Sequence, residues 1–146
     1  MTGRDFMACA EQFAEGLTEA VLRSAVSRAY YGAFHEALVL LHACGVWLPK
    51  TEQVHVKVGY CLRDCGDPDT AMAGQQLDVL RSRRKLADYD LDDNRFAASS
   101  AARREILRAR QILETFDRCR TKPTANFRAK IRSHARLLGL AVSDWA

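Results

Sequence analysis

Residues 23–37 read Arg23-Ser-Ala-Val-Ser-Arg-Ala-Tyr-Tyr-Gly-Ala-Phe-His-Glu-Ala37, and this stretch decides the fold. At about 100° per residue, its apolar side chains fall on one face of a long helix. The opposite face carries polar and aromatic side chains within about 60° of one another. These side chains are Ser24, Arg28, Tyr31, His35 and His42. A solvated face would more typically carry Lys and Glu, so this stripe indicates a protein interface or a ligand site.

A second stretch, residues 83–91, reads Arg83-Arg-Lys-Leu-Ala-Asp-Tyr-Asp-Leu91 and places a charge on an apolar face. Arg84 shares this helical face with Ala73, Leu77, Leu80, Ala87 and Leu91. A buried arginine is costly unless it is paired or hydrogen-bonded. Asp88, four residues further on, is within reach of it on a helix. We therefore predict a buried Arg84 that pairs with Asp88, with Tyr89 or with a second subunit.

The rest of the chain is also periodic in the manner of helices, and no segment alternates convincingly as a strand. The predicted fold class is all-α: an up-and-down bundle of four to five core helices plus a C-terminal amphipathic helix. The second and fifth helices are predicted to be the longest. The predicted helices span residues 5–16, 18–45, 51–66, 67–89 and 94–120, and 46–49 form an apolar connection. A sixth, amphipathic helix follows the linker at 122–124, with Phe127, Ile131, Ala135 and Leu138 on its apolar side.

The chain has 146 residues and a net charge of +4, and its C-terminal segment carries all of that charge. We predict a bundle over residues 1–121 and a basic extension over 122–146, joined by a linker at Lys122-Pro123-Thr124. The cations of the extension that we consider for nucleic-acid contact are Arg128, Lys130, Arg132 and Arg136. A basic segment on a neutral body indicates an anionic partner or a solvated helix face, and both interpretations stay open.

Five cysteines in no short-spaced pattern indicate reduced thiols and a cytoplasmic protein. No apolar run approaches the ~20 residues that span a membrane, and the N-terminus lacks a secretory signal. We therefore expect no membrane association.

Two patterns raise the question of a metal. Cys61 and Cys65 lie one turn apart, but zinc sites normally supply four ligands, so buried thiols are favoured. Residues 88–93 begin like a calcium loop, yet Asp93 stands where that loop needs Gly, so helix capping is favoured. We expect neither a metal nor a cofactor.

The two motifs together resemble the HEPN family of small α-helical proteins. The resemblance rests on Ser27-Arg-Ala-Tyr-Tyr-Gly-Ala-Phe-His35 and, some fifty residues later, on Leu80-Arg-x-x-Arg-Lys-x-Ala-Asp-Tyr-Asp-Leu91, and it covers roughly residues 5–120. It implies a bundle that forms a homodimer through its long helices. Many members are metal-independent ribonucleases that act as toxins or in phage defence. Members are often encoded beside a nucleotidyltransferase partner.

The family signature is an arginine followed, four to six residues later, by a histidine, and both lie at the dimer interface. Arg84 matches the arginine, but the fifth residue after it is Tyr89. Tyrosine, with a reference pKa of ~10 against ~6.5 for histidine, is a poor general base near neutrality. His35 on the facing helix is the candidate replacement for the imidazole.

The sequence therefore supports two hypotheses. The first is an RNA-directed HEPN-like protein that is a metal-independent endoribonuclease, in which Arg84 binds the scissile phosphate. The second is a non-catalytic HEPN-like dimer that binds a partner protein, such as a nucleotidyltransferase, or a nucleotide. The candidate catalytic residues are Arg84, Asp88, Tyr89 and His35, and the candidate binding residues are Ser24, Arg28 and Tyr31.

Overall fold

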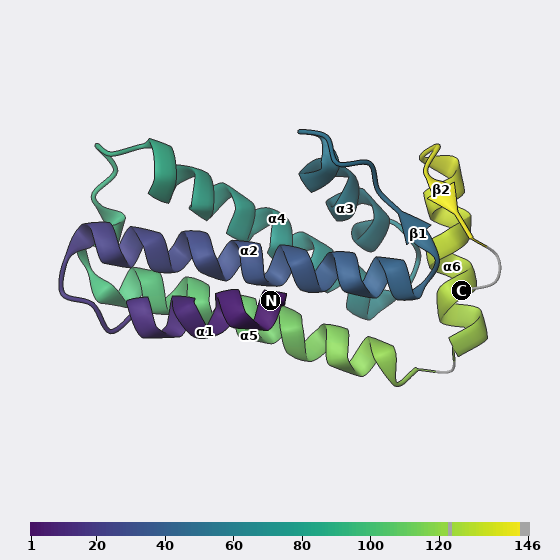
Figure 1. Cartoon of the computed structure of the whole chain (residues 1–146), viewed down its shortest axis with the longest axis horizontal. Coiled ribbons are helices and arrows are strands. Elements are labelled where there is room, and N and C mark those ends of the chain that lie inside the picture. Colours follow the sequence, from purple (N-terminus) through teal and green to yellow (C-terminus); the bar gives the residue numbers. More distant parts are fainter. Residues whose placement is uncertain (123, 144–146) are drawn as a thin grey trace. The chain divides into compact units, whose positions relative to one another are not determined.

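The computed structural model describes residues 1–122 and 124–143 of the chain. This part is an all-α helical bundle, as the periodicity predicts, with six α-helices and one pair of two-residue strands (Figure 1). The helices are α1 (Gly3–Phe13), α2 (Glu19–Ala43), α3 (Val54–Arg63), α4 (Pro68–Tyr89), α5 (Ser99–Arg120) and α6 (Thr124–Leu137). The strands β1 (Val46–Trp47) and β2 (Ala141–Val142) pair antiparallel.

Several predicted boundaries differ from the observed ones. Helix α5 begins at Ser99 and not at Asn94, because a short 3-10 turn, Arg95–Ala97, precedes it. With 22 residues, α5 is no longer than α4, while α2 has 25. Helix α3 begins at Val54 and not at residue 51. Leu91 lies beyond the end of α4 and is exposed, so it does not share the apolar face.

Strand β1 lies in the predicted connection after α2. A strand of two residues is too short to be recognised from an alternation of apolar and polar side chains. The backbone N–H of Ser143 donates to the carbonyl oxygen of Gly45 at 2.7 Å, beside the strand pair. The predicted starts of α2 and α4 are confirmed, whereas α1, α2 and α3 end two or three residues before their predicted ends. The Thr18 hydroxyl accepts a hydrogen bond from the first turn of α2, and Asp67 caps α4 by accepting one from the backbone N–H of Thr70.

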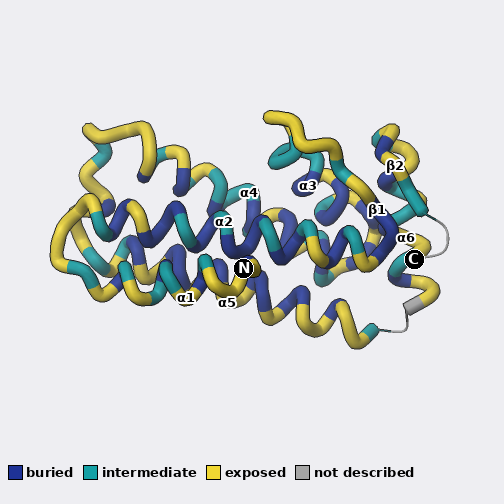
Figure 2. The backbone as a smooth tube through the Cα atoms, in the orientation of Figure 1, coloured by how far each residue is buried: buried dark blue, intermediate teal, exposed yellow. Residues whose placement is uncertain are grey.

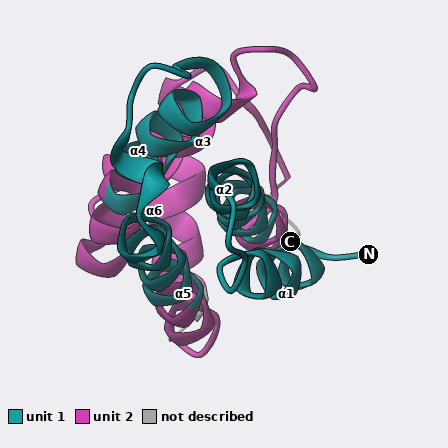
Figure 3. Ribbon diagram, turned by 90° about the vertical axis from the view of Figure 1, so that its left-hand side faces the viewer, with its two compact units in different colours: residues 1–36, 76–113 teal, residues 37–75, 114–146 magenta. Residues whose placement is uncertain are grey.

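The chain divides into two compact units (Figure 3). Unit 1 consists of residues 1–36 and 76–113, and unit 2 consists of 37–75 together with the described part of 114–146. Helices α2, α4 and α5 each contribute residues to both units. The predicted division at residues 121 and 122 stays a prediction, and Pro123 of the predicted linker lies outside the described residues.

The core of unit 1 forms where the apolar face of α2 meets α4 and α5. Leu22 and Val26 of α2 pack with Ala87, Phe96 and Ala102, and dark blue marks such buried positions in Figure 2. Helix α1 approaches α2 so closely at Gly32 that a Cβ there would lie 2.9 Å from the carbonyl oxygen of Gly3. Because only glycine lacks that atom, Gly32 permits the contact between α1 and α2.

Arg23 is a buried charge that ties α2 to the end of α4. Its Nη1 donates to the carbonyl oxygens of Leu86, Ala87 and Asp90 at 3.1, 3.0 and 2.9 Å. Its Nη2 donates to the carbonyl oxygen of Asp93. Its Nε donates to the Glu19 carboxylate at 2.8 Å. The last carbonyls of a helix have no partner within the helix, so Arg23 satisfies the C-terminus of α4.

In unit 2, α6 packs against α3 and both strands. Of its predicted apolar stripe, Phe127, Ile131 and Ala135 are buried, whereas Leu138 lies beyond the end of α6 and is half-buried. Lys122, which we predicted to lie in a linker, is held by carboxylates at the start of α4: its Nζ lies 2.8 Å from Asp67 and 2.8 Å from Asp69. Burial alone would raise the pKa of Asp67, but the Lys122 ammonium and the Thr70 N–H hold it below its usual range.

The Arg23 contacts yield a stability prediction. Replacing Arg23→Met removes the guanidinium from four carbonyls while keeping an apolar side chain. The carbonyls of Leu86 and Asp90 keep a backbone N–H donor. The free energy of unfolding should therefore fall by about 2–4 kcal/mol, chiefly through the carbonyls of Ala87 and Asp93. Urea denaturation followed by circular dichroism measures this loss. Arg103→Met removes an exposed arginine of α5 that forms an exposed ion pair with Glu15 at 3.4 Å, and should cost at most about 0.5 kcal/mol. Equal losses in the two variants would contradict the assigned role of Arg23.

Candidate nucleic-acid site around Arg84

Arg84 lies in α4 and is buried, with 8% of its surface exposed, as the sequence predicts. Its guanidinium carbon lies 5.3 Å from the ring centre of Tyr30, 5.4 Å from that of Tyr31 and 5.9 Å from that of Tyr89. Its Nη1 lies 3.7 Å from Asp88 Oδ2, so the predicted ion pair forms. Its Nε is buried and has no hydrogen-bond partner among the described residues. The arginine is therefore stabilised by aromatic faces and one distant carboxylate, with one donor left over.

The candidate residues Asp88 and Tyr89 lie at the exposed side of this cluster. The Ser27 hydroxyl donates to Asp88 Oδ2 at 3.1 Å, which links α2 to α4. Asp88 itself is exposed. Tyr89 is the last residue of α4, and 76% of its surface is exposed. Tyr89 is therefore open to solvent, whereas the Asp88 carboxylate is held between Ser27 and Arg84.

Tyr31 is shared by two guanidinium groups. The Arg28 guanidinium carbon lies 5.3 Å from the ring centre of Tyr31 and 5.3 Å from that of Phe6 in α1. Arg84 approaches the same Tyr31 ring. We call these four residues, Phe6, Arg28, Tyr31 and Arg84, the Arg84 cluster. It joins two predicted site residues to the predicted arginine within unit 1.

His35 lies at the edge of the Arg84 cluster. Its ring stacks on Phe6 with 5.4 Å between ring centres, and its centre lies 6.5 Å from that of Tyr31. Burial lowers the pKa of His35, although the Glu36 carboxylate opposes this shift. The imidazole is therefore neutral near neutral pH and is able to accept a proton. Its described ring contacts are with aromatic residues, and none is with Arg84.

Two other members of the predicted stripe lie outside the cluster. Ser24 is exposed, and its hydroxyl donates to the carbonyl oxygen of Ala20 in its own helix at 2.9 Å. His42 belongs to unit 2 and stacks on Trp47 with 4.4 Å between ring centres.

Sequence reasoning missed Phe6, which covers part of the stripe. It lies in α1 at the spacing of an ordinary core residue, so only the close packing of α1 against α2 reveals its role. The polar and aromatic stripe of α2 is thus partly covered by α1 of the same chain.

The cations of α6 form a separate group in unit 2. Lys130 and Arg136 are exposed, and Arg128 is half-buried. Arg132 is half-buried, and its Nη1 donates to the carbonyl oxygen of Cys44 at 3.5 Å. Three of the four predicted tail cations therefore stay on the surface or at its edge, while Arg132 also contacts the end of α2.

The described part of the chain has no group of three or more His, Cys, Asp or Glu residues that could hold a metal ion. Cys61 and Cys65 are buried free thiols, and Cys65 Sγ lies 3.2 Å from the Thr70 hydroxyl. Within the described residues, none of the helices combines the length and the apolar character needed to cross a membrane.

Comparison of the chain with protein-family models, with curated proteins and with solved structures gave no match.

The stacking of Phe6 on His35 yields a titration prediction. Phe6→Ala uncovers the imidazole, so the pKa of His35 should rise toward the usual ~6.5. Titration of the histidine ring by NMR measures the shift. Phe13→Ala, a change near the other end of α1, should leave the titration of His35 as it is. A His35 pKa that is the same in wild type and Phe6→Ala would contradict burial by Phe6 as its cause.

The same shift fixes the sign of the contribution of His35 to stability. Its pKa is lower in the folded chain, so the unfolded chain binds the proton more tightly. This contribution is fully present above pH ~6.5 and is lost as the pH falls toward the folded-state pKa. Phe6→Ala should reduce this pH dependence of the free energy of unfolding.

Proposed function

We propose that this protein is a HEPN-like homodimer that acts on RNA and that the Arg84 cluster binds a phosphodiester group of that RNA. The observation that carries the proposal is the sharing of the Tyr31 ring by Arg28 and Arg84, with one buried donor of Arg84 left without a hydrogen-bond partner among the residues that the structure describes. A guanidinium group donates two parallel hydrogen bonds to one phosphate, and aromatic rings stack on bases. An alternation of the two side-chain types is a common way to bind single-stranded RNA.

The proposed activity is metal-independent cleavage of the RNA. In this reaction the ribose 2′-hydroxyl loses its proton to a base and attacks the neighbouring phosphorus. The bond to the 5′-oxygen breaks, that oxygen takes up a proton, and a cyclic phosphate remains. The neutral imidazole of His35 is the candidate base, and Arg84 is the candidate partner for the charge that develops on the phosphate. Asp88 and the exposed hydroxyl of Tyr89 complete the candidate set.

One observation favours the alternative, a non-catalytic HEPN-like dimer that binds a partner protein, such as a nucleotidyltransferase, or a nucleotide. No described contact joins a histidine to Arg84, while Ser27, Asp88 and Tyr30 surround the arginine as a structural network would. Under this alternative the Arg84 cluster binds without cleaving.

The basic residues of α6 are a weaker candidate for RNA contact. Four cations without interleaved aromatic side chains provide electrostatic attraction but no platform for bases. We therefore assign the specific contact to the Arg84 cluster.

RNA binding and cleavage by matched variants test the proposal. Arg28→Gln should weaken the binding of a single-stranded RNA by roughly tenfold, because one charge-assisted contact is lost. Arg103→Gln removes the same charge from an exposed position and is the control. Fluorescence anisotropy measures binding, and gel analysis in the presence of EDTA measures cleavage.

The two readouts separate the hypotheses. Cleavage in EDTA that His35→Asn abolishes while binding persists supports the ribonuclease. Binding without cleavage supports the non-catalytic alternative. Equal RNA affinity of wild type and Arg28→Gln, or no binding by wild type, would overturn the RNA proposal.

The proposed dimer has its own test. An isologous interface brings the same patch of both subunits together, and Ser24 is an exposed residue on the predicted stripe of α2. Light scattering at micromolar concentration should give twice the 16.4 kDa mass of the chain. Ser24→Arg should halve that mass, because a symmetric interface would bring the two introduced arginines, one from each subunit, close together.

The matched control is Ser82→Arg, because Ser82 is also an exposed helical serine whose hydroxyl donates to the carbonyl oxygen four residues earlier. It should stay dimeric. A wild-type mass of 16.4 kDa would contradict the dimer.

A further inference from the structure

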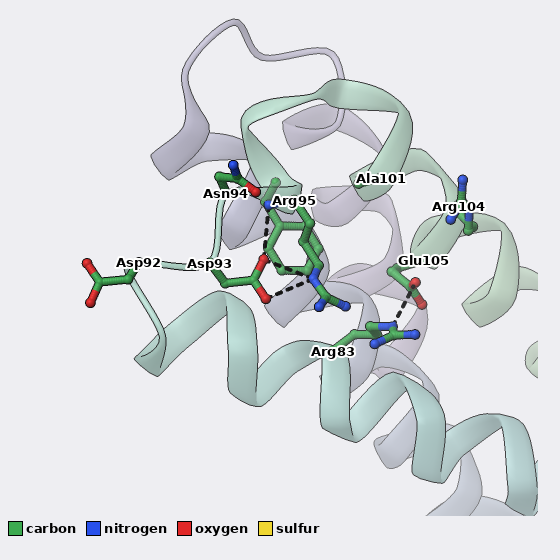
Figure 4. A pocket seen from close by; sticks show the side chains of 9 residues that line it. Arg83, Asp92, Asp93, Asn94, Arg95, Ala101, Arg104 and Glu105 are labelled. Carbon is green, nitrogen blue, oxygen red and sulfur yellow. Dashed lines mark hydrogen bonds and ion pairs between the residues drawn. The ribbon is translucent and has the colours of Figure 1, made fainter.

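A concavity of about 450 Å³ lies in unit 1, at the end of α4, the turn Arg95–Ala97 and the start of α5 (Figure 4). Three arginines line it, one from each of these elements: Arg83, Arg95 and Arg104. Its volume falls in the range of pockets that hold small molecules. The sequence does not predict this pocket, because its residues come from three elements and follow no single periodicity.

Arg95 is held in a fixed direction at the rim of this pocket. Its Nε lies 2.9 and 3.0 Å from the two carboxylate oxygens of Asp93, and its backbone N–H donates to Asp93 Oδ1 at 3.0 Å. These bonds use only the Nε of the side chain, so the two terminal nitrogens keep their donors. Hydrogen bonds from Arg95 hold the pKa of Asp93 below its usual range, which keeps the pair charged.

The buried carboxylate of Glu105 is already neutralised. Its Oε1 lies 3.6 Å from Arg83 Nε, and its Oε2 accepts from Arg108 Nε at 2.8 Å. Glu105 therefore orients Arg83 without opposing an incoming anion. In Figure 4 the carboxylate of Asp92 points away from the three arginines.

Arg104 is the least engaged of the three arginines. It is exposed in the second turn of α5, and within residues 1–122 and 124–143 it has no carboxylate partner. The first turn of α5 also lines the pocket through Ala101 and adds the positive end of a helix dipole. The lining thus carries three guanidinium groups and three carboxylates, those of Asp92, Asp93 and Glu105, and Arg108 outside the lining adds a fourth guanidinium beside Glu105, so the surplus is one positive charge.

We propose that this pocket binds a small phosphorylated ligand of nucleotide size, with its phosphate oxygens on Arg83, Arg95 and Arg104. A carboxylate offers two oxygens to one guanidinium fork, whereas a terminal phosphate offers three oxygens and up to two charges to several forks. The side-chain amide of Asn94 at the rim supplies a donor and an acceptor for a polar group on the rest of the ligand. The proposal uses none of the residues of the Arg84 cluster and does not rest on the proposed function.

Calorimetric titration of the full chain with ADP and with inorganic pyrophosphate tests this pocket. Both probes should bind, because both present phosphate oxygens, and Arg104→Gln and Arg95→Gln should each weaken binding by roughly tenfold. Tighter binding of ADP than of pyrophosphate identifies a nucleotide as the ligand. Equal affinities identify the phosphate groups alone as the recognised element, and both results support the proposal.

Arg103→Gln is the matched control, since Arg103 precedes Arg104 in α5, is exposed and does not line the pocket. Its affinity for both probes should equal that of wild type. Equal weakening by Arg103→Gln and Arg104→Gln would show diffuse surface attraction and would overturn the proposal. Absence of binding by wild type up to about 1 mM of either probe would do the same. Unfolding curves of each variant show that a lost affinity is not a lost fold.

Discussion

The Arg23 guanidinium fixes the end of α4, and both candidate sites depend on where α4 ends. It donates to carbonyl oxygens of the last turn of α4 and of the segment after it, up to Asp93. A buried carbonyl without a hydrogen-bond donor lowers the free energy of unfolding by about 1–3 kcal/mol, so arrangements of this segment that break these bonds are much less stable. Asp88 and Arg84 lie in the turns just before these carbonyls. The side chain of Asp93 orients Arg95 in the pocket, and the backbone carbonyl oxygen of Asp93 accepts a hydrogen bond from Arg23.

A comparison of Arg23 with Arg84 separates a structural arginine from a candidate functional one. Both are buried, with 7% and 8% of their surface exposed. All three guanidinium nitrogens of Arg23 bond to oxygen atoms of the chain. Within the described part of the chain, Arg84 has one carboxylate at 3.7 Å and a buried Nε without a hydrogen-bond partner. A half-satisfied buried cation is costly, and proteins retain such groups mainly where they are used. This contrast is the physical reason for proposing that Arg84, and not Arg23, meets a ligand.

The sequence was sufficient for features set by the geometry of a single helix. The Arg84–Asp88 pair and the buried stripe of α6 follow from a spacing of about 3.6 residues per turn, which holds wherever the helix lies. It was insufficient for features set by packing between elements. The cover of His35 by Phe6 and the bonds of Arg23 to α4 join residues far apart in the chain, and no periodicity encodes them. The predicted start of α5, at Asn94, is five residues too early. Asp93 accepts a hydrogen bond from the backbone N–H of Arg95 in the short turn before α5, but the same residue in the sequence is equally compatible with the cap of a helix.

Arg83 and Arg84 show how one turn of a helix supplies two chemically different surfaces. Successive residues of a helix point about 100° apart, so Arg84 meets the rings of Tyr30 and Tyr31 while Arg83 meets Glu105. The first surface combines cations with aromatic faces, which suits a polymer whose bases stack. Among the described residues that line the second, the one aromatic side chain, Phe96, is buried, and the surface presents guanidinium groups beside carboxylates and the amide of Asn94. Stacking contributes to affinity only at the first surface, so a ligand of the second must carry its binding energy in its charge.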